Sequence, residues 1–158
     1  MSVPGGTLPV METFYGTSLA DQLFQVPVKT DAEVLARVDA IIDPATRRER
    51  TLWLFFLNPD GTQPNLVMPI DEIPSLPGPD EADGLFEMLS HILDPEEPDG
   101  AAGSVVMTLT RPGGLELAEG DRRWLALFRR GVAKCGTPVR MLCLATPEGV
   151  RELGAVKP

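Results

Sequence analysis

The charged side chains best placed to do chemistry lie in residues 110–121, between a predicted strand and a predicted helix. Arg111 directly follows the strand, and Glu119 and Asp121 stand at the start of the helix. In an enzyme, such a junction between a strand and a helix is where a metal site would be built. A guanidinium there can anchor an anion through its planar fork of donors, or it can pair with a carboxylate. We therefore take Arg111, Glu119 and Asp121 as the candidate site and hypothesise that Arg111 and Asp121 pair across the junction.

The other reactive residue types form no catalytic arrangement. His91 is the only histidine, and its place beside the apolar stripe of a predicted helix is typical of the edge of a core. No nucleophile elbow accompanies it. Gly113-Gly114 lacks the Lys-Ser/Thr of a phosphate loop and more simply frees the backbone of the turn. Cys135 and Cys143 are too few for a disulfide framework, and we expect both to be reduced packing residues. We predict no catalytic residue, no metal site and no cofactor.

Composition is that of an ordinary globular protein and argues against several partners. The chain has 158 residues, of which 43% are hydrophobic and 23% charged, which is enough for one domain with a real core. The net charge of −9 argues against nucleic-acid binding, because phosphate contacts need clustered Lys and Arg. No apolar run of about 18 residues is present, and the first residues do not resemble a secretory signal. We therefore predict no nucleic-acid or membrane partner and a cytoplasmic location.

Acidic and basic residues are segregated along the chain. Residues 51–110 include eleven acidic residues and no Lys or Arg, whereas residues 111–158 include nine basic and five acidic residues. The acidic residues gather in loops at 71–83 and 94–99. Solubility alone can explain this segregation. It can also select a basic partner, or provide a self-association surface between two copies of the chain.

Local signals predict alternating helices and strands. A capping box at Thr30 and Glu33 begins a helix that ends at Asp43, because the residue before a proline leaves the α region. The continuous apolar run Thr51–Leu57 predicts a strand buried on both faces. After a turn at 58–61, an antiparallel strand is expected at about 65–70. Further along we expect a helix at 85–93, strands at 104–110 and 139–145 separated by a helix at 118–135, and a turn at 146–149 that leads into a short tail.

The last predicted helix has the clearest two faces. Its buried stripe is expected to consist of Trp124, Phe128, Val132 and Cys135, and Gly136 fits the left-handed position that ends a helix. The opposite face is basic and carries Arg122, Arg129, Arg130 and Lys134.

The order of these elements predicts an α/β fold of three layers, with a mixed β-sheet flanked by helices. We expect residues 1–28 to form an N-terminal arm that is partly flexible. Apolar residues in it, such as Phe14, Tyr15, Phe24 and Val28, would pack on the core. Residues 29–158 are expected to form a single domain.

The segment from residue 47 to residue 153 resembles the JAB/MPN (JAMM) metalloprotease-like domain, in its bacterial RadC-like branch. Residues 49–57 and the turn at 58–61 look like the first strand of that domain and its hairpin. Residues 85–93 look like its helix before the metal strand, and 101–109 look like that strand. Arg111-Pro112-Gly113-Gly114 is similar to the family's His-Pro-Ser-Gly turn. Residues 135–145 and 146–150 look like the later strand and the closing turn. The resemblance implies a cytidine-deaminase-like architecture.

The resemblance also implies that the metal-binding motif is lost. The family holds Zn²⁺ with two histidines one residue apart and a later aspartate, leaving a position open for water. The histidines fall on Leu109 and Arg111, and the aspartate falls on Asp121 with a spacing one residue short. Glu119 takes the place of the family's serine. The catalytic glutamate would fall near Val67 or Met68, with Asp71 and Glu72 a few residues later. The chain therefore resembles a degenerate member, a pseudoenzyme.

Two functions remain open from the sequence. The first is a non-catalytic JAB/MPN-like domain that acts in protein–protein interaction or scaffolding, with a protein partner or as a homodimer. The alternative is a small anionic ligand-binding or regulatory domain that uses the vacated cleft around Arg111.

Overall fold

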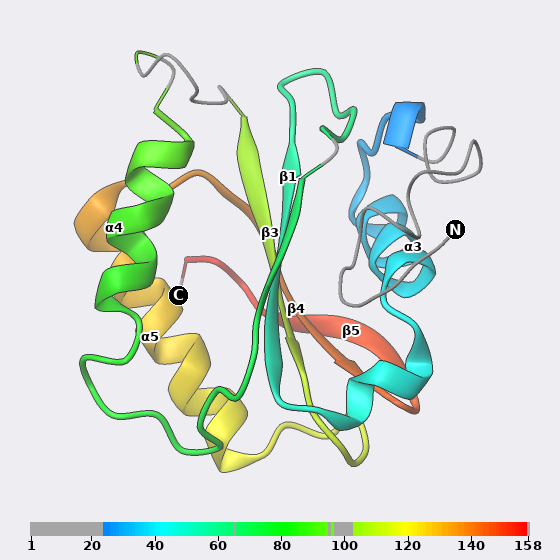
Figure 1. Ribbon diagram of the computed structural model, residues 1–158, viewed down its shortest axis with the longest axis vertical. Coiled ribbons are helices and arrows are strands. Elements are labelled where there is room, and N and C mark those ends of the chain that lie inside the picture. The colour runs from blue at the N-terminus through cyan, green and yellow to red at the C-terminus, as the bar shows by residue number, and fades with distance from the viewer. Residues whose placement is uncertain (1–23, 65, 95, 97–102, 158) are drawn as a thin grey trace.

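The computed structural model describes residues 24–157 except 65, 95 and 97–102. Five strands form one sheet in the order β2-β1-β3-β4-β5. β3 and β4 are parallel, and every other neighbouring pair is antiparallel. α3 covers one face of the sheet, and α4 and α5 cover the other (Figure 1). The predicted mixed sheet with helices on both faces is therefore confirmed, and most of the predicted N-terminal arm lies outside the described residues.

The elements on the first face begin with the predicted capping box. α3 spans Asp31–Ile41, and the Thr30 hydroxyl accepts from the Glu33 amide at 3.1 Å while Glu33 accepts from the Thr30 amide at 2.8 Å. After α3, Pro44 opens a short 3₁₀ helix, η1 (Pro44–Arg48). Arg47 is 1% exposed there. Its guanidinium donates to the backbone carbonyls of Ile42 and Thr146, which ties η1 to the end of β4.

β1 (Thr51–Leu57) is buried on both faces, as predicted. Leu52, Leu54 and Phe56 join the core under α4 and α5, whereas Phe55 and Leu57 join the core under α3. β2 (Val67–Ile70) returns antiparallel, with Leu54 opposite Met68. It begins later than predicted: Leu66 lies before the strand, and residue 65 is outside the described part.

Two helices and two parallel strands build the second half of the domain. α4 spans Asp83–Ile92, β3 Ser104–Thr110, α5 Glu119–Cys135 and β4 Val139–Thr146. These elements match their predicted ranges to within a few residues. Gly136 ends α5 with a φ of 66°, the left-handed conformation predicted for it. Because β3 and β4 are parallel, their carboxyl ends meet at one edge of the sheet, where α5 begins.

Three predictions about side chains and elements are wrong. The predicted tail after residue 149 is a strand, β5 (Gly149–Gly154), which pairs antiparallel with β4. Only Val150 and Leu153 anchor it, one to each core, so no apolar alternation marks it in the sequence. Cys135 is exposed rather than buried, because the last turn of α5 extends past the core. His91 is exposed on α4 rather than at the edge of the core.

No helix among the described residues is both long and apolar enough to cross a membrane.

Candidate functional site

The junction between β3 and α5 is organised by a buried ion pair. Arg111 follows the last residue of β3, and Asp121 lies in the first turn of α5. The Arg111 Nε donates to Asp121 Oδ1 at 2.9 Å, and Nη2 donates to Oδ2 at 2.7 Å. The two residues are 8% and 3% exposed. This is the two-point geometry that suits a guanidinium to a carboxylate, and it confirms the hypothesis that Arg111 and Asp121 pair.

Further hydrogen bonds join the pair to the loop that connects β3 to α5. Arg111 Nη1 donates to the Pro112 carbonyl at 2.8 Å, and Nη2 donates to the Glu116 carbonyl at 3.0 Å. Asp121 Oδ2 accepts from the Ala118 amide at 2.8 Å, which satisfies a backbone donor at the start of the helix. Gly113 has a φ of 100°, so the loop uses the backbone freedom predicted for Gly113-Gly114. The loop between β3 and α5 therefore surrounds the guanidinium of Arg111 and is hydrogen-bonded to it.

Glu119, the third candidate, lies apart from this pair. Its carboxylate binds Arg123 at 2.7 Å, one turn further along α5, and the two side chains are 69% and 50% exposed. An exposed pair of this spacing contributes only about 0.3–0.5 kcal/mol. The structure thus brings together two of the three predicted site residues and leaves Glu119 on the helix surface.

The resemblance assigns positions to the zinc ligands and to the catalytic glutamate, and the side chains there are hydrocarbon or already hydrogen-bonded. Leu109 is 2% exposed in the core under α4 and α5. Val67 is buried in the opposite core, and Met68 packs partly buried against the core that contains Leu109. Asp71 accepts from the Thr51 hydroxyl at 3.2 Å. Among the described residues, no three His, Cys, Asp or Glu side chains gather closely enough to hold a metal ion.

A surface pocket lies beside the junction. Its volume is about 560 Å³. It is lined by exposed arginines, Arg48 and Arg50, by Asp71 and Glu72, and by Pro112 of the junction loop. Charges of both signs therefore surround it. The buried Arg111–Asp121 pair is not among the residues that line it.

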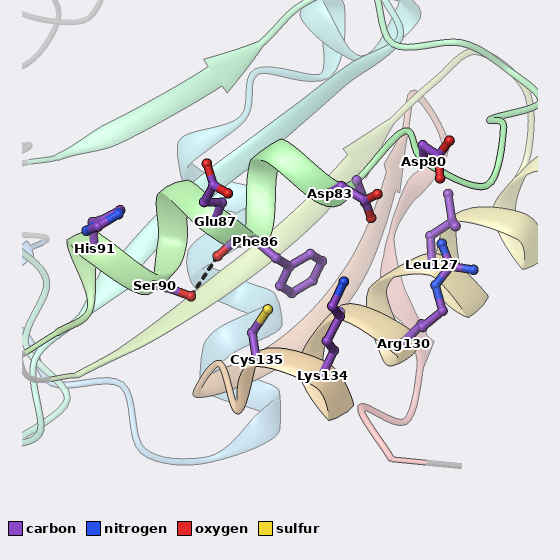
Figure 2. Close-up of a pocket in the computed structure, with 12 residues that line it drawn as sticks. Asp80, Asp83, Phe86, Glu87, Ser90, His91, Leu127, Arg130, Lys134 and Cys135 are labelled. Atoms are coloured by element: carbon purple, nitrogen blue, oxygen red, sulfur yellow. Dashed lines mark hydrogen bonds between the residues drawn. The ribbon is translucent and has the colours of Figure 1, made fainter.

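A second hollow, which the sequence analysis missed, lies between α4 and α5 (Figure 2). Its volume is also about 560 Å³. Asp83, Glu87 and His91 line it from α4, and Lys134 and Cys135 line it from α5. We call it the α4–α5 groove. Two features of the sequence pointed to this groove: the acidic loop at 71–83 and the basic face of the last helix. The sequence did not show that they are neighbours, because the packing of α4 and α5 on one face of the sheet brings them together.

The floor of the α4–α5 groove forms where the side chain of Phe86 on α4 closely approaches Gly131 on α5. The Phe86 ring packs against Gly131, where a Cβ atom would lie only 2.3 Å from the ring. Gly131 therefore allows the two helices to come together over a buried aromatic ring. Cys135 at the end of the groove is an exposed free thiol. Cys143, in contrast, is buried in β4, and burial raises the pKa of its thiol to about 12, so it is a packing residue as predicted.

No family model, no curated protein and no solved structure matches this chain.

The Arg111–Asp121 ion pair is expected to contribute to the stability of the folded chain. Asp121→Ala should lower the free energy of unfolding by about 3–5 kcal/mol, because it leaves a buried guanidinium without its counter-charge. Replacing both partners, as in Arg111→Met/Asp121→Leu, should cost clearly less, because no uncompensated charge then remains. Urea unfolding measures both, and Glu119→Ala in the exposed pair is the matched control. An Asp121→Ala cost no larger than that of Glu119→Ala would contradict a structural role for the pair.

Proposed function

We propose that this protein is a non-catalytic domain of the JAB/MPN-like kind that acts by binding another protein. One observation carries the proposal: at the strand–helix junction where the resemblance puts a metal centre, Arg111 and Asp121 form a buried two-point ion pair. A carboxylate bound by a guanidinium and a backbone amide is not free to act as a base or as a metal ligand. The junction then has a structural role in place of a chemical one.

The order of the elements supports the JAB/MPN-like part of the proposal. The resemblance expects a strand and hairpin, a helix, the motif strand, a helix and a later strand with a closing turn. The chain has β1 and β2, α4, β3, α5 and β4 in that order, and Pro147 and Glu148 form the turn between β4 and β5. Arg111 stands at the end of the motif strand, and Asp121 stands in the first turn of the helix that follows. The degenerate motif would therefore be located where the family has its site.

The surface supports binding to a protein over binding to a small anion at Arg111. The Nε and Nη2 atoms of Arg111 both donate to Asp121, and Nη1 and Nη2 donate to backbone carbonyls, so an anion would have to displace the carboxylate. The α4–α5 groove, in contrast, offers exposed charges on both sides of an apolar floor. The anionic-ligand alternative keeps one supporting observation, the pocket lined by Arg48 and Arg50.

Restoring the missing ligand types tests the family assignment. In Leu109→His/Arg111→His, two imidazoles stand one residue apart at the end of β3, beside an Asp121 that no guanidinium neutralises. We expect this variant to bind one Zn²⁺ per chain and to melt at a higher temperature with zinc than without it. Wild type and the single variant Arg111→His should show neither effect. A double variant that takes up no zinc, whether it is folded or unfolded, would contradict the JAB/MPN-like assignment.

Photo-crosslinking tests the proposed contact with a protein. A photoreactive amino acid in place of Ser90, which lines the α4–α5 groove, should give a discrete crosslinked product in the cells that make the protein. The same amino acid in place of the exposed Glu152 on β5 is the control and should give none. The absence of any product from Ser90 and from other exposed positions of α4 and α5 would contradict a protein-binding role.

A further inference from the structure

We propose that the α4–α5 groove is covered by a second copy of this chain, in a two-fold dimer whose axis runs along the groove. This inference rests on the proposed function and names the partner. It starts from the segregation of charge between the two walls. The loop before α4 and α4 itself supply Asp80, Asp83 and Glu87, whereas α5 supplies Arg130 and Lys134 (Figure 2). All five side chains are exposed.

Within the part of the chain that the structure describes, the charges of the two walls are not paired with each other. Among the described residues, no ion pair within 4 Å joins the acidic wall to the basic wall. Arg130 donates to the Pro79 carbonyl, a neutral acceptor that leaves the charge of the guanidinium uncompensated. Each wall therefore presents charge of a single sign, with an apolar floor of Ala82, Phe86 and Leu127 between the walls. A partner that fits must present a basic ridge beside an acidic ridge in the reverse order.

A second copy of the chain presents this reversed order. β2 and β3 are both antiparallel to β1, and β3 is parallel to β4, so α4 and α5 each connect strands of the same direction. The two helices consequently run the same way along the groove. Rotation by 180° about the groove axis keeps that direction and places α4 of one copy over α5 of the other. Acidic and basic walls then face each other twice.

The alternative two-fold arrangement is excluded by the same charges. An axis that lies across the groove would place α4 over α4 and α5 over α5, so that acidic side chains meet acidic ones and basic meet basic. Like charges placed opposite one another in an interface disfavour that pairing. Each copy also has a net charge of −9, so two copies repel unless oppositely charged surfaces meet. The charge pattern thus selects both the partner and the axis.

Two complementary charge-reversal variants test the dimer. Asp83→Lys/Glu87→Lys makes both walls basic, and Arg130→Glu/Lys134→Glu makes both walls acidic. Sedimentation should show a wild-type dimer that weakens with added salt, and each variant alone should dimerise about 10-fold or more weakly. An equimolar mixture of the two variants should form a heterodimer, because basic walls then face acidic walls on both sides. The matched control variants, Glu148→Lys/Glu152→Lys and Arg48→Glu/Arg50→Glu, carry the same charge changes outside the groove and should leave dimerisation nearly unchanged.

Cys135 provides a second readout in the wild-type chain. It lines the groove and is exposed, whereas Cys143 is buried with a pKa of about 12, so a thiol reagent added at neutral pH to the folded protein reports Cys135. Its labelling should slow as protein concentration rises through the dimerisation range. Labelling independent of concentration in that range would overturn the groove as the interface.

The outcomes separate this inference from the proposed function. A wild-type chain that remains monomeric at every concentration, a dimer that both charge reversals leave intact, or a variant mixture that forms no heterodimer would each overturn the dimer. If the crosslink from position 90 has a mass other than that of two chains, the dimer is wrong and binding to a different protein stands. A product of twice the chain mass supports both.

Discussion

The guanidinium of Arg111 is the constraint on which the β3–α5 junction depends. Nε and Nη2 bind the carboxylate of Asp121, and Nη1 and Nη2 bind carbonyls of the connecting loop. The carboxylate in turn accepts from Ala118, whose own side chain has no acceptor with which to cap α5. One buried pair therefore sets the path of the loop and the start of the longest described helix. Burying these charges is tolerable only because each is opposed by the other and by fixed dipoles.

A second buried arginine holds the same edge of the sheet from the other face. Arg47 donates to the Thr146 carbonyl at the end of β4, and the backbone amide of Arg111 donates to the carbonyl of the preceding residue, Ala145. Arg47 also binds Asp39 and the Ile42 carbonyl, which links α3 and η1 to the sheet. α/β domains usually have their ligand site at the carboxyl ends of the strands. Here the carboxyl ends of β3 and β4 are held by hydrogen bonds from two buried arginines, Arg111 and Arg47. The α4–α5 groove, where binding is proposed, is instead lined by exposed acidic and basic side chains.

The sequence was enough to predict those turns and helix ends that are determined by residues close together in the chain. The Thr30–Glu33 capping box, the turn at Gly61 and the left-handed Gly136 are each determined within a few residues. The Arg111–Asp121 pair was also accessible, because a strand end and the first turn of the next helix are necessarily close. Three features depend on how elements that are distant in the sequence pack together: β5, the exposure of Cys135 and the α4–α5 groove. Hydrophobic periodicity and residue spacing report on local structure and therefore did not predict them. The role of Arg47 was missed because it joins the end of α3, through Asp39 and Ile42, to Thr146 at the end of β4, which is far away in the sequence.

The Arg111 Nε–H resonance in the nitrogen–proton NMR spectrum reports directly whether the β3–α5 junction is closed by its ion pair. A guanidinium enclosed by Asp121 and two carbonyls should give a slowly exchanging Nε–H signal at neutral pH, which titration with phosphate or small carboxylates leaves in place. Asp121→Asn should move this signal, whereas Glu119→Gln should not. A signal that exchanges rapidly with water, or one that shifts to saturation as an anion is added, would mean that Arg111 is an open binding group and would contradict a junction closed by its own ion pair.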